Sequence, residues 1–244
     1  MTDLIGRTVI VTGAASGIGR ACTEKIVAAG GNVVAFDRSE RVRDLEGMQV
    51  LAVIGTAESP ADLHRAVAAT EGHFGGLHGV VAAAGITRSG TADTMSLDDW
   101  NTVLTVNLTS VFLLAQATFP ALRRGGGGAF VAIASQVGLV GYPENVAYCA
   151  AKGGVINLIR ALAVDVSRDG IRPVSVCPGP IDTPMLRTGF QQTGEDMSVV
   201  TGRVPAGRIG TPDEVAAVVT FLLGEDTAFV TGATWTVDGG YTAQ

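Results

Sequence analysis

Cysteine and histidine are both scarce in this sequence, with three of each among 244 residues. The cysteines are odd in number and lack the spacing of metal ligands, which argues against a disulfide framework and favours buried thiols in a reducing cytoplasm. The histidines lie in or beside one predicted helix near residues 61–71, away from any cysteine, so they form no plausible zinc site and no metal is expected. The residues concerned are Cys22, Cys149, Cys177, His64, His73 and His78.

Long apolar runs and basic clusters are also missing. No stretch approaches the ~18 uninterrupted apolar residues of a membrane span, and the N-terminus lacks the pattern of a signal peptide. We therefore expect a cytoplasmic protein with no membrane partner. Lys and Arg number 17 against 23 Asp and Glu, a net charge of -6. With no basic run interleaved with aromatics, nucleic acid is not expected as a partner either.

Charged residues are few, at 16%, whereas hydrophobic residues make up 47% of the chain. The mean hydropathy of +0.35 is high for a soluble monomer and predicts that apolar surface is hidden in contacts between subunits. Oligomerisation is therefore expected. The length suits one α/β domain that spans residues 1–244.

Short apolar runs alternate with helical patterns along the whole chain. Runs typical of buried strands occupy residues 8–12, 32–37, 50–54, 79–83, 129–134 and 173–177, and a last strand is predicted within 232–240. Helical patterns separate them. This alternation predicts a doubly wound parallel sheet of at least six strands with helices on both faces, the Rossmann-type α/β architecture.

A glycine-rich turn, Gly13 to Gly19, joins the first predicted strand to a helix. Glycines in this position let the backbone approach a pyrophosphate, which then lies against free amides at the helix N-terminus. Asp37 ends the next strand, 18 residues after Gly19, the expected distance for an acid that accepts hydrogen bonds from an adenosine ribose. Asp37 would repel a 2'-phosphate and favours NAD over NADP, although Arg38 follows directly. The alternative is a solvated acid at a strand end.

Two polar residues stand at unusual places in this pattern. Asn107 lies in the apolar middle of a long helix that begins near Ser96, so it is either a functional helix irregularity or a satisfied buried amide. Ser135 lies at the carboxyl end of a strand, where ligands bind in open parallel sheets. From 183 to 210 the pattern loosens, which indicates either a mobile substrate lid or a plain surface excursion.

Tyr148 and Lys152 lie four residues apart, which places a phenol and an ammonium on one face of a helix. A free tyrosine titrates near ~10. A nearby ammonium favours the phenolate, so this phenol could exchange a proton with a substrate oxygen near neutral pH. The spacing alone is weak support, because it often arises by chance.

Taken together, these residues resemble the classical short-chain dehydrogenase/reductase family over essentially the whole chain. Thr12 to Gly19 is similar to the cofactor turn of that family. Asn107, Ser135, Tyr148 and Lys152 match its catalytic tetrad, with intervals of 28 residues from Asn107 to Ser135 and 13 from Ser135 to Tyr148. Pro178-Gly179 with Thr183 and the closing Val237-Asp238-Gly239-Gly240 also match.

The resemblance implies a role for each of these residues. Tyr148 is then the general acid/base, Ser135 bonds the substrate oxygen, and Asn107 anchors a water in a proton relay. Lys152 lowers the pKa of the tyrosine and holds the nicotinamide ribose. The residues expected to bind the cofactor are Gly13, Ser16, Gly17, Ile18, Gly19, Asp37, Ala83, Gly85, Tyr148, Lys152, Pro178, Gly179, Ile181 and Thr183. Those expected to bind the substrate are Ser135, Gln136, Tyr142 and Tyr148.

The sequence departs from the family pattern at two places. Ala82-Ala83-Ala84-Gly85 replaces the usual Asn-Asn-Ala-Gly, which removes two amides that tie neighbouring strands together. Gly55-Thr56 stands where an acid often lies near the adenine. We therefore expect weaker contacts on the adenine side, with the reacting centre unaffected.

The resemblance, with Asp37 at its strand end, implies an NAD-dependent oxidoreductase of secondary alcohols and ketones. An NADPH-dependent reductase of 3-oxoacyl thioesters on acyl carrier protein is the alternative, and a non-catalytic dinucleotide sensor ranks below both. A hydrolase is disfavoured because no histidine is suitably placed and no nucleophile elbow is present. A homotetramer is expected.

Further candidates for the lining of the substrate pocket are mostly apolar, namely Leu139, Pro143, Met185, Leu186 and Phe190. Arg88 could pair with a substrate carboxylate, but it is more readily explained as an exposed surface residue.

Overall fold

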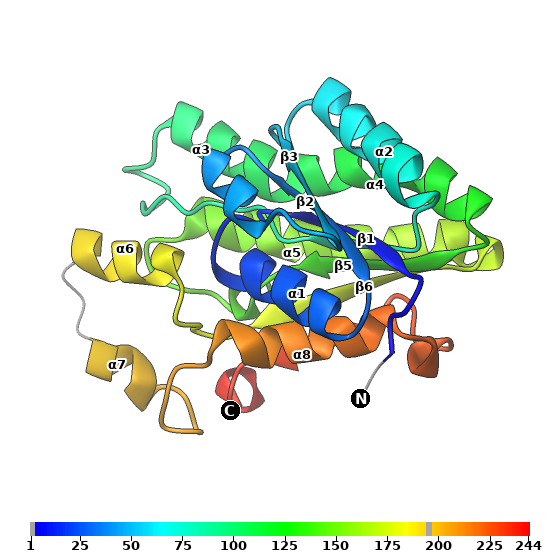
Figure 1. The fold of residues 1–244 in the computed structure, drawn as a ribbon. Helices are drawn as coiled ribbons and strands as arrows, with labels where there is room; N and C mark the ends of the chain where they lie inside the picture. Colours follow the sequence, from blue (N-terminus) through cyan, green and yellow to red (C-terminus); the bar gives the residue numbers. More distant parts are fainter. Residues whose placement is uncertain (1–2, 194–196) are drawn as a thin grey trace.

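A parallel sheet organises residues 3–193 and 197–244, the part of the chain that the computed structural model describes. The described strands form one seven-stranded sheet in the order β3-β2-β1-β4-β5-β6-β7 (Figure 1). Their bounds are β1 (Thr8–Thr12), β2 (Asn32–Asp37), β3 (Val50–Ile54), β4 (Gly79–Ala82), β5 (Gly128–Ile133), β6 (Ile171–Pro178) and β7 (Thr234–Val237). The strand order reverses between β1 and β4, and ligands bind at such a reversal in open α/β sheets.

Helices cover both faces of this sheet, as the alternating pattern predicts. On one face lie α1 (Gly17–Ala28) and α8 (Pro212–Leu223), and on the other lie α2 (Pro60–Phe74), α4 (Ser110–Arg124) and α5 (Val146–Val166) (Figure 1). Each face has its own buried apolar core. Along β1, Val9 and Val11 point into the core under α1 and α8, whereas Ile10 points into the other. This is the two-residue period of a strand that is buried on both faces.

The longest helical stretch, Leu97–Arg124, combines three elements. The first is α3 (Leu97–Leu104), and Ser96 caps it, since the Asp99 amide donates to Ser96 Oγ over 3.0 Å. A π-helical turn, Thr105–Thr109, then leads into α4. This stretch is long and apolar enough to cross a bilayer, but 56% of its most apolar window is buried inside the protein. The core helix of a soluble protein has the same properties.

The segment between β6 and α8 forms two short helices, α6 (Pro184–Thr193) and α7 (Met197–Gly202). Residues 203–207 pack against the C-terminus, where the Ala206 amide donates to Gly239 O over 3.0 Å. The Gln244 side chain donates to the backbone carbonyl of Arg203 over 2.9 Å. The segment with the irregular sequence pattern therefore contains two helices. Its movement as a substrate lid stays a prediction.

Candidate active site

The glycine turn between β1 and α1 closes against itself and against the segment that follows β4. A Cβ atom on Gly19 would lie 2.2 Å from the carbonyl oxygen of Gly13, and one on Gly13 would lie 2.9 Å from Ala83. Gly13 and Gly17 also have positive φ angles, 69° and 53°, which side chains rarely tolerate. Only glycine fits at positions 13, 17 and 19 without strain or a close contact, and the N-terminus of α1 faces the cavity.

Asp37 lies directly beside the glycine turn, as its place at the end of β2 predicts. Its Oδ2 accepts a hydrogen bond from the Ala15 amide at 3.0 Å, and its Oδ1 accepts one from the Ser39 amide at 2.9 Å. These bonds fix the carboxylate but leave lone pairs available, because a carboxylate can accept about four hydrogen bonds. Arg38 and Arg41 line the same end of the cavity.

Thr12, at the end of β1, is bonded to the backbone that follows β4. Its Oγ1 accepts hydrogen bonds from the amides of Ala83 at 3.1 Å and Ala84 at 3.3 Å. The side chain at the end of β1 therefore ties the backbone after β4 in place. The departure from the family pattern leaves this part of the sheet connected.

Asn107 proves to be both a helix irregularity and a satisfied buried amide. It lies in the π-helical turn and is fully buried. Its Nδ2 donates to the carbonyls of Ile86 and Val103, both at 2.9 Å, and its Oδ1 accepts from the Ile86 amide at 3.3 Å. A Cβ on Gly85 would lie 2.8 Å from this oxygen. Asn107 thus fixes the chain at Ile86, one wall of the cavity, without lining the cavity itself.

Ser135, Tyr148 and Lys152 come together at the carboxyl ends of β5 and β6. Ser135 follows β5 and caps a short 3-10 helix, η3 (Gln136–Gly138), accepting from the Val137 amide at 3.3 Å. Lys152 is buried, its Nζ donates to Ile133 O over 2.7 Å, and the same nitrogen lies 5.6 Å from the centre of the Tyr148 ring. The predicted pairing of phenol and ammonium on one face of α5 is therefore present.

The electrostatics of this trio differ from the sequence-based expectation. Burial raises the pKa of Tyr148 to about 12, and a side-chain hydrogen bond with Ser135 offsets only part of that rise. Burial also lowers the pKa of Lys152 to about 8. The expected lowering of the tyrosine pKa is therefore wrong for the protein alone, because loss of solvent outweighs the neighbouring groups.

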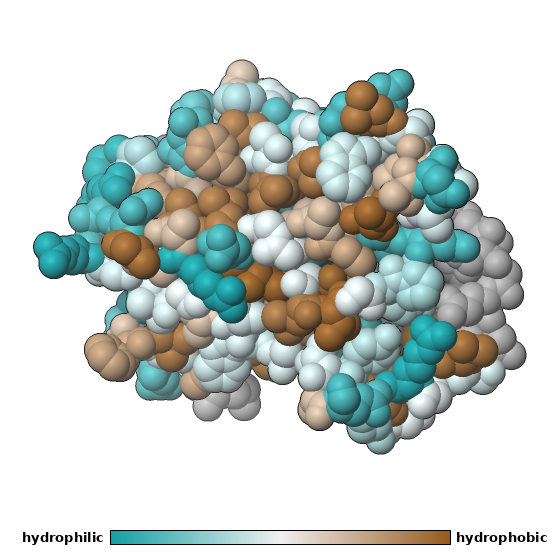
Figure 2. Space-filling model, turned by 180° about the vertical axis from the view of Figure 1, so that it is seen from behind, coloured by the Kyte–Doolittle hydropathy of each residue, from teal (hydrophilic) through white to brown (hydrophobic). Residues whose placement is uncertain are grey.

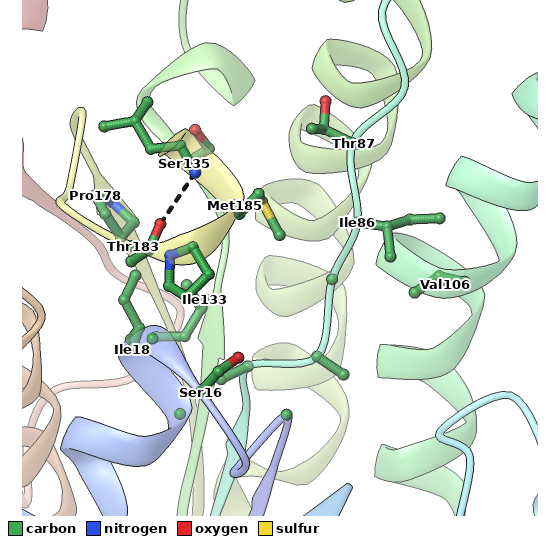
Figure 3. Close-up of a pocket in the computed structure, with 18 of the residues that line it drawn as sticks. Ser16, Ile18, Ile86, Thr87, Val106, Ile133, Ser135, Pro178, Thr183 and Met185 are labelled. Carbon is green, nitrogen blue, oxygen red and sulfur yellow. Dashed lines mark hydrogen bonds between the residues drawn. The ribbon is translucent and has the colours of Figure 1, made fainter. Parts of the chain in front are cut away.

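One cavity of about 540 Å³ joins these parts. Figure 3 shows Ser135, Pro178, Thr183 and Met185 on one side of it, with Ile86, Thr87 and Val106 opposite and Ser16 and Ile18 at one end. All the residues expected to bind cofactor or substrate line this cavity. Sequence reasoning missed several further lining residues, namely Arg41, Glu58, Thr87, Asn145 and Val200.

Only some of the additional residues expected in the substrate pocket line the cavity. Met185 and Leu186 of α6 line the cavity, whereas Leu139 and Pro143 do not. The side chain of Phe190 lies outside the described part of the structure. Arg88 is exposed and lies 3.7 Å from the Asp99 carboxylate, so the surface interpretation of this arginine is confirmed.

Comparison with known proteins identifies the family. A family model described as enoyl-(acyl carrier protein) reductase matches residues 13–242. The 2-(R)-hydroxypropyl-CoM dehydrogenase of Xanthobacter autotrophicus is 37% identical, with 98% of this chain and 100% of that protein covered. The chain belongs to the short-chain dehydrogenase/reductase family. It is an oxidoreductase of the CH–OH group, and membership implies a nicotinamide cofactor.

Other members of the short-chain dehydrogenase/reductase family are similar over the same length. Cyclohexanol dehydrogenase of Acinetobacter is 38% identical over 98% of this chain and 96% of its own. The 3-oxoacyl-[acyl-carrier-protein] reductase FabG of Salmonella typhimurium is 34% identical over 96% and 97%. The crystal structure of levodione reductase superposes with a TM-score of 0.93 at 30% identity, covering 98% of this chain and 99% of that one.

The residues present fit a dinucleotide. The glycines at 13 and 19 let the turn pack closely on itself and on Ala83, and the turn lines the cavity together with the N-terminus of α1. Asp37 stands at one end of the same cavity, and Lys152 with Tyr148 stands among the residues beyond β5 and β6. A nicotinamide cofactor of the family can therefore be held by this chain's own groups.

Proposed function

We propose that this protein is an NAD-dependent dehydrogenase that interconverts a secondary alcohol and a ketone. The observation that carries the proposal is the Asp37 carboxylate, which is fixed beside the glycine turn by the Ala15 and Ser39 amides. A negative charge there accepts ribose hydroxyls and repels a 2'-phosphate. The cofactor-binding residues are those of the glycine turn, the segment at Ala83–Gly85, Asp37, Lys152 and the loop from Pro178 to Thr183.

In the proposed reaction, the bound nicotinamide supplies the hydride acceptor. Ser135 donates a hydrogen bond to the substrate oxygen and orients it toward Tyr148. The Tyr148 phenolate accepts the hydroxyl proton of the alcohol, and the phenol returns it when a ketone is reduced. The Lys152 ammonium stabilises the phenolate. Asn107 holds the cavity wall at Ile86 through its hydrogen bonds to that residue, and a water relay at Asn107 stays a prediction.

A second function has one observation in its favour. Arg38 and Arg41 both line the cavity beside Asp37, and a guanidinium is well suited to bind a phosphate. An NADPH-dependent reductase of 3-oxoacyl thioesters is therefore the alternative. A dinucleotide sensor without turnover ranks third, because a sensor has no need of the Ser135, Tyr148 and Lys152 set.

The deciding experiment follows absorbance of the reduced nicotinamide with NAD or NADP and a panel of secondary alcohols, hydroxy acids and diols. Turnover that is strong with NAD and weak with NADP supports the proposal. Turnover with NADPH and a 3-oxoacyl thioester alone would establish the reductase instead. Binding of NADH without turnover of any substrate would favour the sensor.

Replacing Asp37 by serine is expected to raise the ratio of kcat/KM with NADP to kcat/KM with NAD by about 10-fold or more, because a like-charge contact costs several kcal/mol. The ratio is measured with one alcohol under fixed salt. Glu58→Gln is the matched control, since Glu58 is a second carboxylate that lines the cavity. An unchanged ratio in Asp37→Ser would refute the ribose assignment.

We further propose a cytoplasmic homotetramer that acts on small molecules and engages neither nucleic acid nor a membrane. Large apolar side chains are exposed on the helices of one face, including Phe112 of α4 at 47% and Val164 of α5 at 85%. Figure 2, seen from behind, shows brown apolar surface at several places on the molecule. Light scattering at micromolar concentration is expected to give four times the mass of the chain, and a monomer would contradict the assembly.

A further inference from the structure

The side chain of Gln136 presents a buried polar atom with no partner in the described part of the structure. Gln136 is 5% exposed and lines the cavity. Its Oε1 is one of two buried side-chain atoms that lack a hydrogen bond there, and the other, Thr8 Oγ1, belongs to a residue outside the cavity lining. A buried polar group without a partner destabilises a protein. Such a group inside a ligand cavity therefore indicates a ligand that forms the missing hydrogen bond.

The backbone around Gln136 holds this side chain next to the reacting centre. Gln136 directly follows Ser135, and its carbonyl accepts from the Leu139 amide at 2.9 Å and the Val140 amide at 3.1 Å. A Cβ on Gly138 would lie 2.7 Å from the carbonyl carbon of Lys152, so η3 packs directly on α5 beside the Tyr148 turn. The carboxamide is thus tied to the same frame as Ser135 and Tyr148.

Two other polar side chains that line the cavity, those of Thr87 and Asn145, already have partners. Thr87 Oγ1 donates to Asn145 Oδ1 over 3.3 Å, and Asn145 Nδ2 donates to Pro143 O over 2.9 Å. The cations among the cavity-lining residues described are Arg38 and Arg41, which lie beside Asp37, and Lys152, which bonds Ile133 O. A carboxylate, sulfonate or phosphate next to Gln136 would therefore lack a free positive charge.

We infer that Gln136 recognises a second, neutral hydroxyl group on the substrate, close to the carbon that reacts. This inference rests on the proposed dehydrogenase function and names its substrate class, a diol or polyol that is oxidised to a hydroxy ketone. A hydroxyl suits this site because it donates to the carboxamide oxygen and accepts from the carboxamide nitrogen. It therefore pairs with Gln136 in either orientation of the amide.

The test compares two alcohols of similar size that differ in one group, cyclohexane-1,2-diol and 2-methylcyclohexanol. The wild-type protein is expected to oxidise the diol with the higher kcat/KM. In Gln136→Met, which keeps the length of the side chain and removes its polar atoms, the preference for the diol should fall by about 10- to 100-fold. Thr8→Val is the matched control, because it removes the other unpartnered buried atom away from the cavity and should leave the preference unchanged.

The outcomes separate this inference from the proposed function. If wild type and Gln136→Met oxidise both alcohols with the same preference, the assignment of Gln136 is overturned and the dehydrogenase function stands. If wild type shows no turnover of any alcohol with either cofactor, both are overturned. If Gln136→Met lowers the melting temperature or abolishes NADH binding, Gln136→Asn is used instead, because it keeps a carboxamide but shortens its reach. The ratio of kcat/KM for the diol to kcat/KM for 2-methylcyclohexanol then decides in the same way.

Discussion

Tyr148→Phe is expected to lower kcat for alcohol oxidation by about 10²- to 10⁴-fold, the range that a positioned acid/base group contributes. The substitution removes only the phenol oxygen, the group to which the proposal assigns the exchange of a proton with the substrate oxygen. The aromatic ring remains, so its packing against the small buried cluster of Val103, Ala147 and Ala151 is retained. Steady-state kinetics at saturating cofactor and substrate measure the loss.

Two measurements show whether that loss is chemical. The melting temperature and the dissociation constant for NADH should stay close to the wild-type values, because the phenol oxygen supports neither the core nor the glycine turn. Tyr241→Phe is the matched control, since Tyr241 lies in the short C-terminal helix and does not line the cavity. Near wild-type turnover in a folded Tyr148→Phe protein would remove Tyr148 from the mechanism.

Much of the fold could be predicted because its signals are local. The two-residue period of β1 and β2 and the glycines between Gly13 and Gly19 each depend on neighbours in the sequence. Parallel strands then bring their carboxyl ends to one edge of the sheet. This places Asp37 and Ser135 at one cavity without any knowledge of packing.

Contacts between distant segments could not be predicted in the same way. The bonds from the Ala83 and Ala84 amides to Thr12 join residues about 70 positions apart, with no pattern that marks them. The π-helical turn at Asn107 follows from its bonds to Ile86, 21 residues earlier. The sequence shows that an asparagine is unusual at that point of a helix and matches a family position, but it does not show which segment the asparagine binds.

The pKa of Tyr148 could not be predicted from the sequence for the same reason. The four-residue spacing correctly places Lys152 beside the phenol, but burial depends on every segment that packs around it. Because burial holds the phenol neutral, with a pKa of about 12, the charge of the Lys152 ammonium has a large effect on the acid/base function.

Lys152→Met is therefore expected to shift the pH dependence of alcohol oxidation upward by about 1 to 3 units, the effect of an opposite charge within ~4–6 Å. Oxidation requires Tyr148 to accept a proton, so the rate rises with pH as the phenolate forms. An ammonium stabilises the phenolate, and its loss raises the phenol pKa and moves this rise to higher pH. At neutral pH the rate should fall about 10- to 1000-fold, since one pKa unit corresponds to a tenfold change.

The pH profile distinguishes this electrostatic role from simple misfolding, which would lower the rate equally at every pH. The positive charge of an oxidised nicotinamide, when bound, would lower the phenol pKa into the measurable range, so Lys152→Met should recover part of its activity at high pH, where the phenol of the variant ionises. Arg160→Met is the matched control, because Arg160 is an exposed cation on the same helix α5 and solvent screens its charge. If Lys152→Met lowers the rate but leaves the pH dependence where it is in the wild type, Lys152 acts in cofactor binding alone. The phenolate would then need another source of stabilisation.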